Sequence, residues 1–252
     1  MNISTSWGKV AKWYDELLNK NSYQKDLILP NLIRLLKIKK GEKLLDLGCG
    51  QGFFSREFAK LGGSVTGIDI SSELIEIAKK YKGESVEYHV AQANELTFLT
   101  NETIDKITII LALQNIENVN NVIAECCRVL KPDGSIFIVL NHPAFRIPKK
   151  SSWGFDIDRK IQYRRIDSYL GETKEQIAMH PGIKPWEKTI SFHRPLQFYF
   201  KVLNKYGFCV SRLEEWNSLK ISESGPRKDA EDTARREIPL FLFFECSKNK
   251  TQ

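Results

Sequence analysis

One stretch, Lys43–Ser55, limits what this chain can fold into more than any other. It reads K-L-L-D-L-G-C-G-Q-G-F-F-S. The apolar run before the glycines predicts a buried strand, and the apolar spacing over residues 53–61 predicts a helix after them. Gly48, Gly50 and Gly52 suit a tight turn, because glycine tolerates positive φ and lets a ligand approach the backbone. Such a strand, turn and helix form a ligand site at a strand's carboxyl end in open parallel α/β sheets.

A carboxylate, Asp69, follows the glycines by about 20 residues in the sequence. Residues 64–70 form a second short apolar run, which contains Asp69. In dinucleotide-type folds, an acid about 20 residues past the glycines binds the ribose hydroxyl pair. The start of the helix also offers unpaired N–H groups to an anionic group. The turn and the acid together predict a site for an adenosyl-type ligand.

The glycine spacing separates two classes of cofactor. The nicotinamide fingerprint is G-x-G-x-x-G, whereas this chain has G-x-G-x-G, with Asp46 two residues before the first glycine. This D-x-G-x-G-x-G pattern resembles the first motif of the class I S-adenosylmethionine-dependent methyltransferases, and in particular the type-11 group that includes quinone-biosynthesis methylases. The alternative is a structural turn that only packs the helix on the strand.

The resemblance extends in order through residues 10–140 and implies a fold. That fold is α/β, with a Rossmann-like seven-stranded mostly parallel sheet, helices on both faces and an insertion after strand five. The resemblance also implies S-adenosyl-L-methionine as cofactor, S-adenosyl-L-homocysteine as product, and a set of binding residues: Tyr14, Asp46, Gly48, Cys49, Gly50, Gly52, Asp69, Ile70, Gln92, Ala93 and Leu111.

Two of these residues need comment. Tyr14 is the expected lid over the cofactor, since Val10–Asp15 resembles the V-A-x-x-Y-D stretch of many relatives. Gln92 stands where relatives usually carry the aspartate of G-D-A, near the adenine amino group. An amide oxygen still accepts a hydrogen bond there, but without a charge.

The loop over residues 112–119, A-L-Q-N-I-E-N-V, narrows the choice of acceptor. In relatives this loop lies beside the methyl donor. It lacks the N-P-P-Y signature of amino-group methylation on adenine or glutamine, and it lacks the Pro-Cys pair of cytosine C5 methylation. These absences count against two classes of nucleic-acid methyltransferase.

Composition adds weaker expectations. A net charge of +7 suits a nucleic-acid or acidic partner, although a lysine-rich surface is the simpler interpretation. Five cysteines without C-x-x-C, and an N-terminus without an apolar signal core, predict a cytoplasmic protein. No apolar run is long enough to span a membrane. The four histidines show no metal-ligand spacing, so no metal is expected.

The chain is expected to form a single methyltransferase domain over residues 1–252. Its parts are N-terminal helices (1–40), a cofactor-binding core (41–140), an insertion that covers the substrate (141–194), and a C-terminal helix and strands (195–252). Within the insertion, alternation over residues 161–165 predicts a strand, and residues 188–193 its antiparallel partner. Long ordered loops at this place are usually functional.

Three polar side chains are candidates for a catalytic base: His142, Tyr163 and His193. A sulfonium methyl group mainly needs orientation and a dry pocket, and a base is needed only where the acceptor must lose a proton. Each candidate has a structural alternative: His142 and His193 can hold the turns before Pro143 and Pro195, and Tyr163 can pack on a strand.

Three arginines, Arg164, Arg165 and Arg194, suit bidentate binding of an acidic acceptor, or are simply solvated. The sequence therefore predicts a methyltransferase that acts on a small molecule. The alternatives are an RNA or protein methyltransferase, and a non-catalytic module that binds S-adenosylmethionine.

Overall fold

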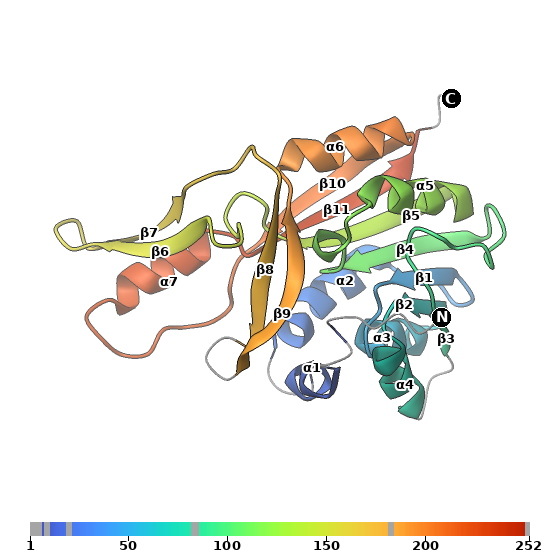
Figure 1. Ribbon diagram of the computed structural model, residues 1–252, viewed down its shortest axis with the longest axis horizontal. Helices are drawn as coiled ribbons and strands as arrows, with labels where there is room; N and C mark the ends of the chain where they lie inside the picture. Colours follow the sequence, from blue (N-terminus) through green and yellow to red (C-terminus); the bar gives the residue numbers. More distant parts are fainter. Residues whose placement is uncertain (1–6, 8–10, 19–21, 82–85, 181–183, 250–252) are drawn as a thin grey trace.

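A seven-stranded sheet forms the centre of the molecule (Figure 1). The computed structural model describes residues 7, 11–18, 22–81, 86–180 and 184–249. The strand order is β10-β11-β5-β4-β1-β2-β3. The parallel strands are β1 (Lys43–Leu47), β2 (Ser64–Asp69), β3 (Val86–Val90), β4 (Ile104–Ile110) and β5 (Leu130–Asn141), and the antiparallel edge pair is β10 (Phe208–Trp216) and β11 (Phe241–Lys248). The predicted mostly parallel sheet is confirmed.

Helices cover both faces of the sheet, and α7 (Lys228–Glu237) packs against β7 instead. The other described helices are α1 (Ala11–Leu18), α2 (Leu29–Leu36), α3 (Phe53–Lys60), α4 (Ser72–Lys80), α5 (Val119–Val129) and α6 (Leu196–Lys205), with a π-helical turn η2 (Gln24–Ile28) and a 3-10 turn η3 (Leu113–Asn115). Side-chain caps fix the start of two of them. Ser71 Oγ accepts the Leu74 N–H at the start of α4, and Asn118 Oδ1 accepts the Asn121 N–H at the start of α5.

The two faces of the sheet build two separate cores, because successive side chains of a strand point to opposite faces. In β5, Ile136, Ile138 and Leu140 enter the core beneath α5 and α6. Phe137 and Val139 enter the other core, beneath α2 and α3. All five are at most 2% exposed, so β5 is buried on both sides, as a central strand should be.

The segment between β5 and α6 forms two separate antiparallel hairpins. β6 (Ser151–Asp156) pairs with β7 (Ile161–Ile166), and β8 (Thr173–His180) pairs with β9 (Lys184–His193). The predicted pairing of residues 161–165 with residues 188–193 was therefore wrong. Each strand pairs with its neighbour in sequence, which closes a shorter loop at a smaller entropic cost.

The hairpins lie beyond the carboxyl ends of the parallel strands. Figure 1 shows β8–β9 standing across that edge, with β6–β7 and α7 forming a lobe on its far side. Helix α7 packs against β7, and the turn η3 packs against β9. The hairpin β8–β9 therefore lies between the sheet and the lobe.

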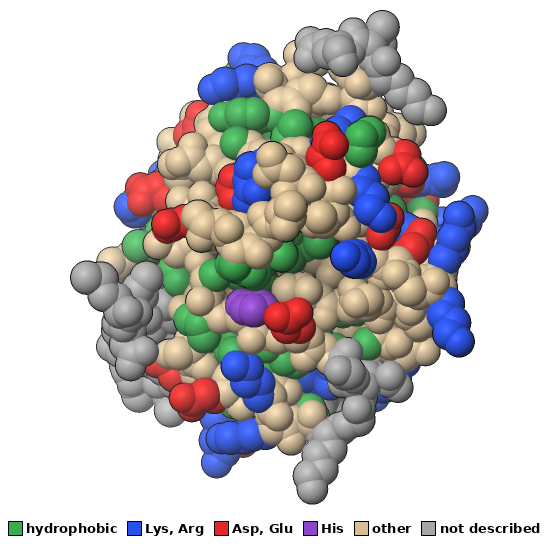
Figure 2. All heavy atoms as spheres, turned by 90° about the vertical axis from the view of Figure 1, so that its right-hand side faces the viewer, with side chains coloured by type: hydrophobic (Ala, Val, Ile, Leu, Met, Phe, Trp, Pro, Cys, Tyr) green, Lys and Arg blue, Asp and Glu red, His purple; other side chains and the backbone are tan. Residues whose placement is uncertain are grey.

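Charge at the opposite end of the molecule is mixed. Figure 2 shows Lys and Arg side chains around the rim of that face, with Asp and Glu side chains among them. This face presents no continuous basic stripe of the kind that tracks a phosphate backbone. In the part of the chain that the structure describes, no helix has the length and apolarity needed to cross a membrane.

Candidate functional site

A cavity of about 350 Å³ lies at the carboxyl ends of β1, β2, β3 and β4. Its walls come from the glycine turn after β1, the end of β2, and the segments that follow β3 and β4. Trp7 and Leu74 of α4 complete the lining. The carboxyl edge of an open α/β sheet is where such folds place ligands, so this cavity is the candidate site.

The glycine turn has a backbone shape that other residues resist. Gly48, Gly50 and Gly52 have φ values of 72°, 56° and 78°. A Cβ atom on Gly48 would lie 2.5 Å from the Cβ of Ala112, which follows β4. A Cβ atom on Gly52 would collide with the Tyr88 hydroxyl. The turn therefore needs glycine for its conformation and for its close packing on β3 and β4.

Asp69 holds the turn from the end of β2. Its Oδ2 accepts the Gly50 N–H at 2.9 Å, and its Oδ1 accepts the Ser71 N–H at 2.9 Å. Burial raises the pKa of Asp69, and these backbone N–H groups oppose that shift. Each carboxylate oxygen has a second lone pair, so Asp69 keeps acceptor capacity for donors inside the cavity that it lines.

Asp46 supports the turn from beneath. It is 2% exposed and is not part of the cavity wall. Its carboxylate accepts Ser55 Oγ–H at 2.6 Å and Thr108 Oγ1–H at 2.9 Å, which joins β1 to α3 and β4. Burial raises the pKa of Asp46 to about 6, and the two hydroxyl bonds limit the rise. Its contacts are those of a buried support.

The loop after β4 contains a second unusual backbone conformation. Leu111 lines the cavity with φ 53°, a left-handed value that is uncommon outside glycine. Its N–H donates to the Val139 carbonyl at 2.8 Å. Its carbonyl accepts the side-chain amides of Gln114 at 3.0 Å and Asn115 at 3.3 Å. These bonds hold the residue in a strained shape, of the kind that clusters at ligand sites.

The cavity brings together most of the residues predicted to bind the cofactor. Those that line it are Gly48, Gly50, Asp69, Ile70, Gln92, Ala93 and Leu111. Asp46, Cys49 and Gly52 do not line it: Cys49 is buried, and Gly52 caps α3. Tyr14 belongs to α1, but its side chain lies outside the described residues.

Some lining residues were missed by the sequence analysis. Trp7 lies far from the motifs in sequence, and no pattern marked it. Residues 115–118 also line the cavity. They belong to the loop that the resemblance places beside the methyl donor, but none of them was named as a binding residue.

The candidate catalytic residues lie elsewhere. None of His142, Tyr163 and His193 lines the cavity. His142 Nδ1 accepts the Ala144 N–H, so Nε2 carries the proton and donates to Glu215 at 2.7 Å. Burial lowers the pKa of His142, and Glu215 opposes that shift.

The other two candidates, His193 and Tyr163, lie on the hairpins, away from the cavity. His193 is 4% exposed, and its Nε2 lies 2.7 Å from the Tyr169 carbonyl oxygen. Tyr163 lies on β7 with 45% of its surface exposed. Within the described ranges, no cluster of three His, Cys, Asp or Glu side chains is placed to hold a metal ion.

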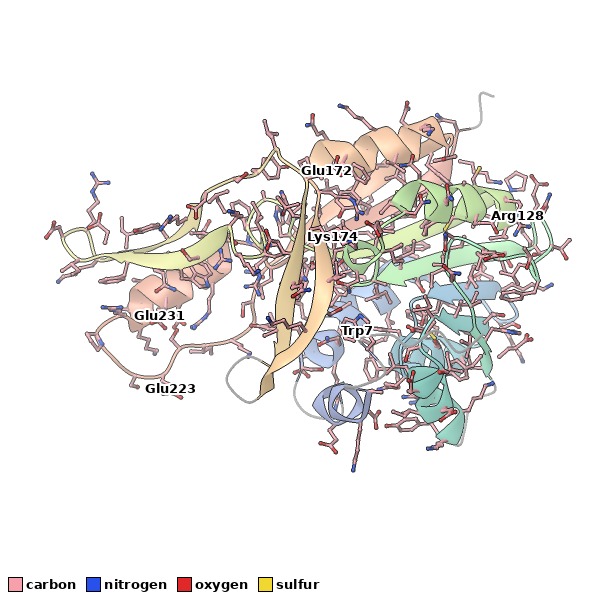
Figure 3. The ribbon with its side chains drawn as sticks, in the orientation of Figure 1. Trp7, Arg128, Glu172, Lys174, Glu223 and Glu231 are labelled. Atoms are coloured by element: carbon pink, nitrogen blue, oxygen red, sulfur yellow. The ribbon has the colours of Figure 1, made fainter. Side chains whose placement is uncertain are left out.

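Polar contacts fasten the hairpin β8–β9 to the cavity wall. Arg194 Nη2 donates to the carbonyls of Ile116 at 2.9 Å and Glu117 at 2.7 Å. Lys174 Nζ lies 2.9 Å from Glu117 Oε1. Figure 3 shows Lys174 on the hairpin and Trp7 on its sheet side, whereas Glu223 and Glu231 lie in the far lobe. The hairpin thus touches the same loop that lines the cavity.

Known proteins share this architecture and its motifs. Residues 45–138 match the family model of a methyltransferase domain. The chain is 32% identical over 154 residues to the mitochondrial ubiquinone biosynthesis O-methyltransferase of Homo sapiens, covering 54% of this chain and 42% of that protein. It is 33% identical over 141 residues to the ubiquinone biosynthesis O-methyltransferase of Dechloromonas aromatica, covering 52% and 59%. The chain spans about half the length of the curated relatives it matches.

A solved structure agrees over nearly the whole fold. The S-adenosylmethionine dependent methyltransferase from Mesorhizobium loti superposes with a TM-score of 0.71 at 25% identity, covering 89% of this chain and 99% of that one. Together these matches confirm the predicted resemblance to the class I methyltransferases and the Rossmann-like fold.

Proposed function

We propose that this chain, whose core at residues 45–138 is a class I S-adenosylmethionine-dependent methyltransferase domain, transfers a methyl group to a small-molecule acceptor. The observation that carries the proposal is the cavity, in which a positive-φ glycine turn faces the Asp69 carboxylate. The names of the relatives, which are O-methyltransferases, support a hydroxyl oxygen as the acceptor.

The lining residues fit the donor group by group. Asp69 would accept hydrogen bonds from the ribose hydroxyls, and Ile70, Gln92 and Ala93 would surround the adenine. The backbone at Gly48 and Gly50 would face the methionine portion, which needs close approach without side chains. These roles cover six of the seven predicted residues that line the cavity. The seventh, Leu111, would lie beside the methyl group of the donor.

The donor supplies a sulfonium methyl group that is already reactive toward a nucleophile. What the chain supplies is orientation and a dry cavity. Among the described residues that line the cavity, the titratable side chains are those of Asp69 and Glu117. Neither His142 nor His193 lines it. We therefore place the main contribution to rate in positioning, and the basic roles of His142, Tyr163 and His193 stay predictions.

Binding of the donor product tests the site. Asp69→Ala should weaken S-adenosyl-L-homocysteine by about tenfold or more, because a hydrogen bond to a charged group contributes about 1.5–3 kcal/mol. Calorimetric titration measures this. The exposed Asp133, which lies outside the cavity, provides the control Asp133→Ala. Unchanged affinity in a folded Asp69→Ala protein would remove Asp69 from the site.

A metabolite extract with labelled S-adenosyl-L-methionine tests the reaction. We expect label in a small molecule. Label in RNA or protein would instead support the alternative suggested by the net charge of +7. Tight donor binding without any labelled product would indicate a non-catalytic binding module.

A further inference from the structure

Tyr81, at the end of α4, contacts two other helices. Its hydroxyl donates to Asp15 Oδ1 of α1 at 2.5 Å. The Arg56 guanidinium of α3 lies over its ring, 3.9 Å from the ring centroid. The polar tip and the aromatic face of one side chain therefore join α1 to α3.

Arg56 extends this connection to the glycine turn. Its Nη1 donates to the Gln51 carbonyl at 2.6 Å, and its Nη2 donates to Gln51 Oε1 at 2.8 Å. Gln51 has no exposed surface and stands between Gly50 and Gly52. One guanidinium thus holds both the main chain and the side chain of a buried residue, which the single ammonium of lysine cannot do in the same geometry.

The turn that Arg56 holds forms part of the cavity wall. Gly50 lines the cavity, and its N–H donates to Asp69 Oδ2 at 2.9 Å. The turn is therefore fixed at two successive residues, one bonded to Asp69 and the next bonded to Arg56. Neither Arg56 nor Tyr81 lines the cavity, so each can affect a bound ligand only through the turn or through α1.

Helix α1 is connected to the same cavity at its other end. Trp7, which precedes α1 in the sequence, lines the cavity. The helix lies against α4 (Figure 1), and its length of 8 residues is too short for a stable isolated helix in water. Its order therefore depends on contacts with its neighbours, and the bond from Tyr81 to Asp15 is one of them.

We propose that Arg56 and Tyr81 are positioning residues, which couple the docking of α1 on α4 to binding of the methyl donor. The inference rests on the proposed function. A donor in the cavity would touch Trp7 at one end of this network and the glycine turn at the other, and would thus favour the docked position of α1. The coupling is reciprocal, so a docked α1 would raise donor affinity by the same factor.

Hydrogen exchange of the α1 amides measures this docking in the full chain without ligand. Tyr81→Phe removes the hydroxyl but keeps the ring over Arg56, so α1 exchange should become about threefold to tenfold faster. Glu16→Gln, at an exposed residue of the same helix, should change the exchange rate less than about twofold. Exchange in Tyr81→Phe as slow as in wild type would overturn the inference.

Ligand dependence tests the coupling itself. Saturating S-adenosyl-L-homocysteine should slow α1 exchange in wild type about fivefold or more. Arg56→Lys keeps the charge and loses the forked bonds to Gln51, so it should reduce this protection and weaken S-adenosyl-L-homocysteine binding by the same factor. A merely structural Arg56 would lower the melting temperature on substitution but leave the protection unchanged, and that result would overturn the inference.

A double-mutant cycle shows whether the two residues act together. If Arg56 and Tyr81 belong to one connection, the combined variant should lose less S-adenosyl-L-homocysteine affinity than the product of the two single losses. Losses that multiply would mean that the turn and the helix are held separately, and would overturn the inference. Tyr206→Phe is the control, because this ring also lies near a cation, Lys205, at the end of a helix and does not line the cavity. It should change the affinity less than about twofold.

The same measurements separate this inference from the proposed function. A wild type that binds no S-adenosyl-L-homocysteine overturns the proposed function, and the exchange rates of the free protein still test the link from α1 to the glycine turn. Normal S-adenosyl-L-homocysteine binding with α1 exchange that does not respond to it overturns the coupling and leaves methyl transfer standing. Binding that slows α1 exchange in wild type, and slows it less in Arg56→Lys and Tyr81→Phe, supports both.

Discussion

The central sheet and the two hairpins after β5 are stabilised by different interactions. β1 and β4 each have at least four buried residues, counting both faces of the sheet. Leu44, Leu45, Ile107 and Ile109 have no exposed surface at all. On the hairpin β6–β7, by contrast, Ile161 is 51% exposed. Isolated two-stranded hairpins are only marginally stable. The hairpins therefore depend on their neighbours: α7 packs against β7, η3 packs against β9, and polar side-chain bonds link both hairpins to nearby loops.

This difference assigns different properties to the two sides of the site. Apolar burial fixes the sheet side, which on the proposed function would hold the same donor in every turnover. A few side-chain bonds, from Arg164, Arg194 and Lys174, hold the two hairpins, which on the proposed function would cover the acceptor. A cover held in this way can change sequence without disturbing the sheet, as expected of functional loops on a rigid scaffold.

The largest effect is expected in the glycine turn of the sheet side. Gly50→Val should abolish detectable S-adenosyl-L-homocysteine binding, because valine resists φ 56° and its side chain would occupy the cavity. Gly41→Val is the control, since Gly41 has φ 82° and open space around its Cβ position. It should lose a similar backbone energy, about 1–2 kcal/mol, and still bind. Binding by folded Gly50→Val would make the turn merely structural.

The second effect concerns the buried acid beneath that turn. The pKa of Asp46 is raised from 3.8 to about 6, so the folded state binds more protons than the unfolded state between these values. Stability from this group is therefore present below pH 3.8 and is lost as the pH rises through 6. Asp46→Asn removes the titration and keeps a group of similar shape that hydrogen-bonds Ser55 and Thr108.

The measurement is chemical unfolding of both proteins at pH 4 and pH 7. The difference between Asp46→Asn and wild type should shift in favour of the variant by about 2 kcal/mol between these pH values. Asp133→Asn, at an exposed carboxylate, should show no such shift. Parallel curves for Asp46→Asn and wild type would mean that Asp46 is already ionised at pH 4.

Sequence and structure agree best where local signals and buried surface act together. The glycine turn, Asp69 and the apolar strands lie within short windows whose spacing specifies the local structure, and the resemblance supplied the seven-stranded, mostly parallel sheet. The hairpins were not predictable in this way. Alternation marks residues 161–165 as a strand but does not identify the segment that pairs with it, which is β6 and not the predicted residues 188–193.

The candidate site shows the same division. Most residues of the motifs line the cavity as predicted. Trp7 also lines it, although it belongs to a part of the chain without a motif. His142 and His193 were singled out because histidine titrates near neutrality. Burial and the partners Glu215 and Tyr169 occupy them, and the sequence carries no sign of partners that are 73 and 24 residues away.

A smaller effect tests the role of His193 on the hairpin side. His193→Ala should lower the free energy of unfolding by about 1–3 kcal/mol, because it leaves the Tyr169 carbonyl without its donor. Turnover per folded molecule should survive. His89→Ala is the control, since His89 bonds the exposed Glu87. The opposite pattern, full stability with turnover reduced by about 10²–10⁴-fold, would restore His193 as a general base.

The smallest effect is expected where the two regions meet. Lys174→Met removes the ion pair with Glu117, whose partners are 52% and 71% exposed. Exposed pairs contribute about 0–1 kcal/mol, and Met keeps an apolar stem over Phe192. We expect the free energy of unfolding to change by less than about 1 kcal/mol, with S-adenosyl-L-homocysteine affinity within about twofold. Arg194→Met should cost more, because Arg194 is 4% exposed and bonds two loop carbonyls. The contrary result would be a tenfold loss of S-adenosyl-L-homocysteine affinity in Lys174→Met, with wild type losing the same affinity at high salt. That result would show that one surface charge on the hairpin affects the donor cavity. The two regions would then be coupled more closely than their packing indicates.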